Sequence, residues 1–207
     1  MPAARPPAFP LYMQCDARWG ADEMGVVGDG ERSTICGEGC AMSCLAMVLK
    51  GVGVPVFGTL PATPQTLNAW LLTNVGYTCI DGDCNDLVLD AVQRLDPRVR
   101  LVGYLAVPPF AELAAGVAAG ALAYIARIVP DDPRFESHFI LLTGLSPTAP
   151  AANFTVLDPF YPKASPETKT AQIAPTTESA LTRITLAWAN VAAPLTPRTD
   201  RVPVRRL

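Results

Sequence analysis

The stretch "STICGEGCAMSCLAMVLK", residues 33–50, spaces three cysteines four positions apart and ends in an apolar run. From Cys40 onward, small and apolar residues recur at helical spacing until Gly51. Gly37 and Gly39 disfavour a helix that begins earlier, since glycine is a poor helix former. The stretch therefore predicts a central helix that starts at Cys40.

A thiol at the start of a helix suits nucleophilic chemistry, because the helix dipole and the free backbone N–H groups stabilise a thiolate. Cys40 is therefore the candidate nucleophile. The sequence has one histidine, His138, at the head of "HFILLTGL", and it is the candidate base. Asp158, at the end of "NFTVLDPF", would lie beside it if the two runs pair as a hairpin. The alternatives are a structural histidine and an aspartate that starts a turn before Pro159.

Other roles for the cysteines remain open on sequence alone. Cys36 follows a loop and is a second candidate nucleophile, whereas Cys44 lies one turn inside the helix, where core packing is the ordinary role. A buried structural role is also the alternative for Cys40. A zinc or iron–sulfur site is a rival use of four thiols, although their spacing is unlike that of the usual short-loop sites: Cys15, Cys36, Cys40 and Cys44.

The composition is that of a globular protein. Of 207 residues, 50% are hydrophobic and 17% are charged, which is enough apolar material for a core. The net charge of −3 gives no reason to expect nucleic acid as a partner. The distribution of proline and charge predicts an extended arm over residues 1–9, a single domain over 10–195 and a basic tail over 196–207.

Helical patterns dominate the first half of the chain. The run "TPQTLNAWLLTN", residues 63–74, has Thr63 as a cap and Pro64 at the first helical position. A further helix is predicted over 85–96, with Asn85 as its N-terminal cap. Another is predicted over 108–120 and ends at Gly120.

The second half is rich in β-forming runs. Strands are predicted over residues 121–129, 138–145 and 153–160, and 98–105 is a further candidate. The run over 181–191 fits either a strand or a helix. Helices followed by an antiparallel sheet are typical of the α+β class.

The start of the chain lacks the apolar segment of a secretory signal, and the small apolar stretch 113–126 is too short to span a membrane. We therefore expect a cytoplasmic protein by default, or one that reaches a virion or the exterior by a non-classical route. Six cysteines without a signal do not predict a disulfide framework, and buried thiols are the expected role for most of them. Cys79 and Cys84, in "CIDGDC", form a small disulfide or are two unrelated thiols.

Five blocks of the sequence together share the order and spacing of the motifs of one known family. They are "QCDARWG" (14–20), "GCAMSCLAMVLKGVG" (39–53), "TPQTLNAWLLTNVGY" (63–77), "HFILLTG" (138–144) and "LDPFYP" (157–162). Over roughly residues 9–165 the chain resembles the C39-like papain-fold cysteine peptidases. The resemblance implies a papain-like fold, in which a helical half with its central helix starting at the nucleophile precedes an antiparallel sheet.

The resemblance also implies a role for each site residue. Cys40 would be the nucleophile, His138 the general base and Asp158 the residue that orients the base. Gln14 would form the oxyanion hole together with the backbone N–H of Cys40. Such an enzyme is a cysteine peptidase or amide hydrolase that needs no cofactor or metal. Its partner is a peptide or protein substrate, and the peptides of peptidoglycan belong to this class.

Two alternatives stay open beside this reading. The same triad serves hydrolysis of peptidoglycan amide bonds, deamidation or acyl transfer. A catalytically silent C39-like structural or binding module, for example a phage virion component, is the other. Glu38, close to the nucleophile, favours the silent module, and so do Ala41 and Met42, where many relatives carry Gly-Pro.

Overall fold

The computed structural model describes most of the region that carries the predicted motifs. The described residues are 8–25, 33–80, 83–96, 99, 110–119, 123–128, 138–145, 154–160 and 181–187. The basic tail, most of the predicted arm and, apart from Val99, the candidate strand over 98–105 lie outside them.

The central helix begins where the sequence predicts. α2 spans Cys40–Gly51, and a short helix, α1, spans Ile35–Glu38 immediately before it. The expectation that Gly37 and Gly39 prevent a helix before Cys40 is wrong. The Thr34 hydroxyl caps α1 by accepting a hydrogen bond from the Gly37 N–H, so one helical turn forms in spite of the glycine.

Gly39 separates the two helices and sets the start of α2. Its N–H donates to the carbonyl of Ile35 at 2.9 Å, and it is the N-cap residue of α2. A Cβ atom at this position would collide with the carbonyl oxygen and side chain of Ile35. Only glycine allows the backbone to come this close, and this close approach presents Cys40 at the first position of the new helix.

The other predictions in the helical half are partly confirmed. α3 spans Pro64–Thr73 and is capped by Thr63, as expected. The helix predicted over 85–96 is wrong at its start, because Asn85 lies in β4 (Asp83–Leu87), which pairs with β3 (Tyr77–Ile80). The Cys79–Cys84 disulfide closes this hairpin, and the helical spacing is realised only in a 3-10 helix, η1, over Leu89–Arg94. A small two-stranded pair, β1 (Glu23–Met24) and β2 (Ser33–Thr34), precedes α1.

A four-stranded antiparallel sheet follows, in the order β7-β6-β5-β8. Its strands are β5 (Tyr124–Ile128), β6 (His138–Leu145), β7 (Phe154–Leu157) and β8 (Leu181–Ala187), and α4 spans Phe110–Ala119. The run over 181–191 therefore contains a strand. Helices and antiparallel sheets together confirm the α+β class.

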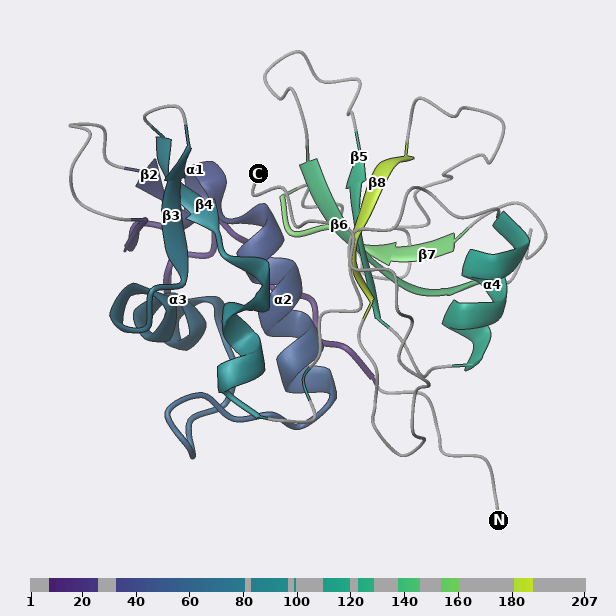
Figure 1. Ribbon diagram of the computed structural model, residues 1–207, viewed down its shortest axis with the longest axis horizontal. Helices are drawn as coiled ribbons and strands as arrows, with labels where there is room; N and C mark the ends of the chain where they lie inside the picture. Colours follow the sequence, from purple (N-terminus) through teal and green to yellow (C-terminus); the bar gives the residue numbers. More distant parts are fainter. Residues whose placement is uncertain are drawn as a thin grey trace, which may run out of the picture.

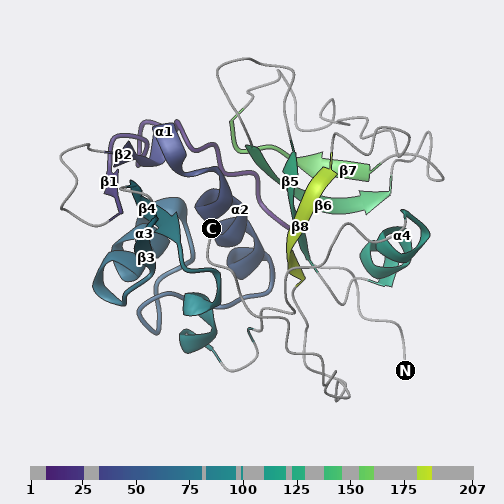
Figure 2. The same cartoon turned by 45° about the horizontal axis from the view of Figure 1, so that its top comes forward.

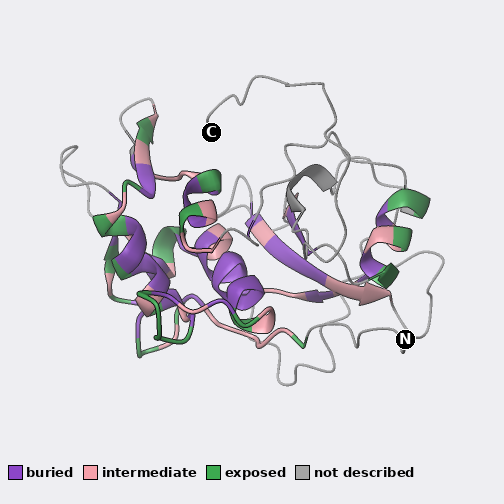
Figure 3. Cartoon of the chain, turned by 60° about the horizontal axis from the view of Figure 1, so that its bottom comes forward, coloured by how far each residue is buried: buried purple, intermediate pink, exposed green. Residues whose placement is uncertain are grey.

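Both faces of the sheet are covered. Figure 1 shows α2 on one side of the sheet and α4 on the other, and the turned view in Figure 2 agrees. Leu141 of β6 belongs to the core around α2, whereas its neighbours Ile140 and Leu142 pack with Leu113 of α4. This alternation follows from the two-residue period of a strand. Most of α2 is buried as a result (Figure 3), and its N-terminus is held beside the sheet.

Candidate active site

The predicted hairpin brings the histidine and the aspartate together. β6 and β7 pair in antiparallel register, with Leu141 opposite Leu157, so Asp158 directly follows the paired segment. His138 Nε2 and Asp158 Oδ1 lie 2.8 Å apart. His138 is only 2% exposed, so this contact is shielded from water. A buried, charge-assisted hydrogen bond of this kind fixes the plane of the imidazole.

The Cys40 side chain is the second partner of this imidazole. Burial by itself would lower the pKa of His138, but hydrogen bonds to the side chains of Asp158 and Cys40, together with the charges of both, raise it to about 9. The imidazole is therefore protonated at neutral pH. Cys40 is half-buried and is not in a disulfide, so its sulfur is open to reaction.

The turn after β7 holds the aspartate in place. The Phe160 N–H donates to Asp158 Oδ1 at 2.9 Å, and the Phe160 ring meets the His138 ring edge to face, with centroids 6.3 Å apart. The carboxylate is thus held by its own turn. The aspartate starts a turn, as the alternative interpretation of Asp-Pro predicts, and the same oxygen, Oδ1, also contacts His138 Nε2.

Gln14 lies between the two parts of the site. Its backbone N–H donates to the carbonyl of Pro159 at 2.7 Å, next to Asp158. Its side-chain Nε2 donates to the carbonyl of Cys36 at 2.7 Å, four residues before Cys40. Gln14 is 1% exposed, so the side chain is held in one position and its Nε2 retains a second hydrogen for another acceptor.

The N-terminus of α2 supplies further donors. Gly39, the N-cap residue, has no side chain to cap the helix. The first backbone N–H groups of an α-helix have no acceptor within the helix, and the dipole makes that end positive. The N–H of Cys40 is the first of them, which suits it to bind a developing negative charge beside the sulfur.

The remaining cysteines correct several expectations. Cys15 and Cys36 form one disulfide and Cys79 and Cys84 another, so the prediction of reduced thiols without a disulfide framework is wrong. Cys36 cannot be the nucleophile, and the four-thiol metal site is not assembled. Proximity between the loop of Cys15 and α1 explains the error, because Cys15 and Cys36 are 21 positions apart and only the fold brings them together.

Cys44 takes the core role expected for it. It is fully buried, its thiol donates to the carbonyl of Phe139 at 3.5 Å, and burial raises the pKa of this thiol well above its usual range. Glu38, by contrast, is exposed at the end of α1. No group of three or more candidate metal ligands occurs among the residues that the structure describes, and none of its described helices is long and apolar enough to cross a membrane.

Sequence reasoning missed three parts of the site: the carbonyl of Pro159, the ring of Phe160 and the Cys15–Cys36 disulfide. The run "DPF", residues 158–160, carried a signal for the first two, since Asp-Pro predicts a turn that folds the following residues back.

Comparison with models of protein families, with curated proteins and with solved structures finds no match to this chain.

The site predicts a specific pH dependence of stability. The pKa of His138 is raised from 6.5 in the unfolded chain to about 9, so folding strengthens proton binding. The stabilisation is complete below about pH 6.5 and is lost as the pH rises through 9. We expect the free energy of unfolding to fall by about 3 kcal/mol over this window, since one pKa unit corresponds to about 1.4 kcal/mol.

Urea unfolding at pH 6 and at pH 10 measures this effect. His138→Gln is the control, because glutamine does not titrate and other groups remain the same. A fall of equal size in both proteins would contradict the assignment of the titration to His138.

Proposed function

We propose that this protein is a papain-like thiol hydrolase that cleaves amide bonds through a Cys40 thioester, with peptides or proteins as substrates. One observation carries the proposal: the His138 imidazole has the Cys40 side chain on one side and the Asp158 carboxylate on the other. A nucleophile, a base and a group that orients the base are the three parts of such a centre.

The His138 ring lies next to the Cys40 sulfur, and its pKa is raised to about 9, so it is a cation at neutral pH. A cation in this position stabilises a thiolate, which is the form of the sulfur that attacks. The thiolate sulfur attacks the carbonyl carbon of the substrate amide and forms a C–S bond. The carbonyl oxygen becomes an oxyanion, which the Cys40 N–H and the remaining Nε2 hydrogen of Gln14 stabilise.

Breakdown of this intermediate needs the same imidazolium. It gives its proton to the amide nitrogen as the C–N bond breaks, and the amine leaves. Neutral His138 then takes a proton from water, which attacks the thioester, and the C–S bond breaks to restore the thiolate. Asp158 keeps the ring in position and stabilises its positive form through both steps.

Alkylation by iodoacetamide tests the thiolate–imidazolium pair without knowledge of the substrate. At pH 6 we expect Cys40 to be the labelled residue, and His138→Gln to slow its labelling at least about tenfold, because the cation that stabilises the thiolate is gone. Cys44 serves as the internal control, since it is fully buried. Equal labelling rates in the two proteins, located by mass spectrometry, would count against the pair.

A further inference from the structure

We propose that the Cys15–Cys36 disulfide is a redox-sensitive brace for Gln14, so that a dithiol reductant turns the site off while Cys40 stays intact. The inference rests on the proposed function, because it concerns the oxyanion hole of that same site.

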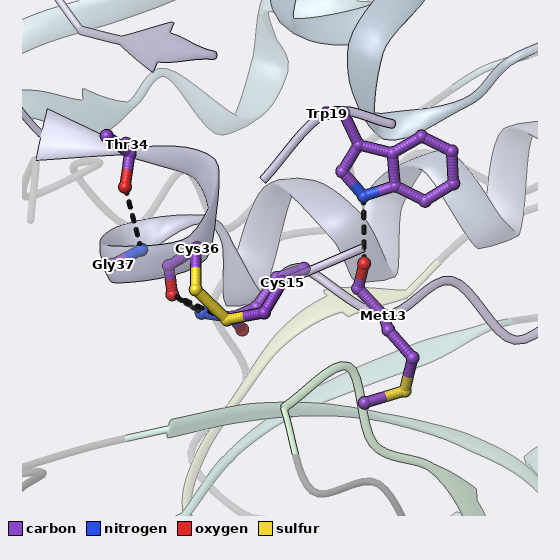
Figure 4. The surroundings of a disulfide bond; sticks show 7 residues. Met13, Cys15, Trp19, Thr34, Cys36 and Gly37 are labelled. Carbon is purple, nitrogen blue, oxygen red and sulfur yellow. Dashed lines mark hydrogen bonds between the residues drawn. A yellow bond between two sulfur atoms is a disulfide. The ribbon is translucent and has the colours of Figure 1, made fainter. Parts of the chain in front are cut away.

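The disulfide adjoins Gln14 on both sides. Cys15 follows Gln14 in the chain, and the carbonyl of Cys36 accepts the hydrogen bond from Gln14 Nε2. The bond therefore ties the backbone of the glutamine to the residue that its side chain binds. Figure 4 shows the disulfide joining the loop of Cys15 to α1, with the Trp19–Met13 and Gly37–Thr34 hydrogen bonds on either side.

The brace closes a ring of contacts around the site. The backbone N–H of Gln14 donates to the carbonyl of Pro159, the preceding residue is Asp158, and Asp158 binds His138. His138 contacts Cys40, and the chain returns through α1 to Cys36. The disulfide is the covalent link in this ring between the Gln14 loop and α1. Without it, the loop and α1 are joined by hydrogen bonds alone: from Gln14 Nε2 to the carbonyl of Cys36, from the Cys36 N–H to the carbonyl of Gly20 and from the Ile35 N–H to the carbonyl of Asp22. Each of these contributes little by itself, and only the first holds the side-chain amide of Gln14.

A reductant can reach this bond. Cys15 is exposed and Cys36 is half-buried. A thiolate of a dithiol attacks the Cys15 sulfur, the Cys36 thiolate leaves, and the second thiol of the reductant displaces Cys15 from the mixed disulfide. The protein gains two thiols, and the dithiol is oxidised to its own disulfide, so two electrons are transferred in all.

Loss of the brace should affect hydrolysis and alkylation differently. Hydrolysis passes through an oxyanion, and one lost oxyanion donor slows an enzyme by about a hundredfold or more. Alkylation of Cys40 by iodoacetamide forms no oxyanion and needs only the thiolate. A displaced Gln14 therefore slows hydrolysis and leaves alkylation of Cys40 unchanged. Partial unfolding of the whole site would change both rates.

The main experiment compares two variants that each lack one disulfide. Cys15→Ser/Cys36→Ser removes the brace, and Cys79→Ser/Cys84→Ser removes the hairpin disulfide as the matched control. We expect the first to slow cleavage of a proteome-derived peptide library at least about tenfold, with Cys40 alkylation within about threefold of the wild type. The control should keep both rates. If Cys15→Ser/Cys36→Ser slows cleavage and alkylation by the same factor, or leaves the cleavage rate unchanged, the inference is overturned.

A second experiment uses the natural chain and covers the case in which the variant does not fold. The wild type is treated with dithiothreitol, assayed, and reoxidised in air after the dithiothreitol is removed, which should restore cleavage. Gln14→Ala treated in the same way should lose less than about twofold on reduction, because the braced group is already absent. An equal loss in Gln14→Ala overturns the inference. If the oxidised wild type shows no Cys40-dependent cleavage, it is the proposed function that fails.

Discussion

Replacing Cys40 by alanine is expected to reduce amide cleavage by at least about a thousandfold while leaving the fold intact. The thioester needs the sulfur, and no other described cysteine can replace it: four are in disulfides, and Cys44 is fully buried. The measurement is the appearance of new peptide termini in a proteome-derived peptide library, with peptidoglycan fragments as a second substrate set. The two sets distinguish a peptidase from an enzyme of the cell wall.

Cys44→Ala is the matched control for this variant. It removes a thiol from the same helix, one turn further on, and should keep the cleavage rate within about threefold at a small cost in stability. Cleavage that persists in Cys40→Ala would place the chemistry elsewhere. Wild-type protein that cleaves neither substrate set, although its Cys40 is alkylated, would favour the silent module instead.

Replacing Gly39 by alanine is expected to destabilise the protein by about 3 kcal/mol, a large effect for the addition of one methyl group. The new Cβ would collide with the backbone carbonyl of Ile35, which a change of rotamer cannot relieve. Ile35 is fully buried, so α1 cannot simply move away. The N-terminus of α2 must shift, and Cys40 shifts with it. Thermal or urea unfolding measures the loss of stability, and iodoacetamide labelling measures the displacement of the sulfur.

Gly37→Ala tests whether the effect is specific to this contact. A Cβ at Gly37 would have its nearest neighbour, the Thr34 hydroxyl, at 3.6 Å, which is an ordinary contact. We expect the free energy of unfolding of this variant to differ from that of the wild type by less than about 1 kcal/mol. The change can have either sign, because alanine also favours the helix. Similar unfolding midpoints for both alanine variants would show that the close approach of Gly39 to Ile35 is unimportant.

Local patterns were sufficient where one element is controlled by nearby residues. α2 starts at Cys40 because a glycine and a short apolar repeat act within a few residues, and α3 starts at Pro64 because Thr63 caps it. The hairpin of β6 and β7 followed from two adjacent β-rich runs. The same local reasoning failed at Asn85, where pairing with β3 and the Cys79–Cys84 disulfide override a helical repeat.

The sequence by itself therefore determined the α+β class, the start of the central helix and three candidate reactive residues: Cys40, His138 and Asp158. Only the tertiary structure decided that these residues meet, that Cys36 is in a disulfide and that Gln14 is held between Pro159 and Cys36. The physical reason is range. Helix caps and strand periodicity act over a few residues, whereas contacts between residues 20 or more positions apart depend on how the whole chain packs.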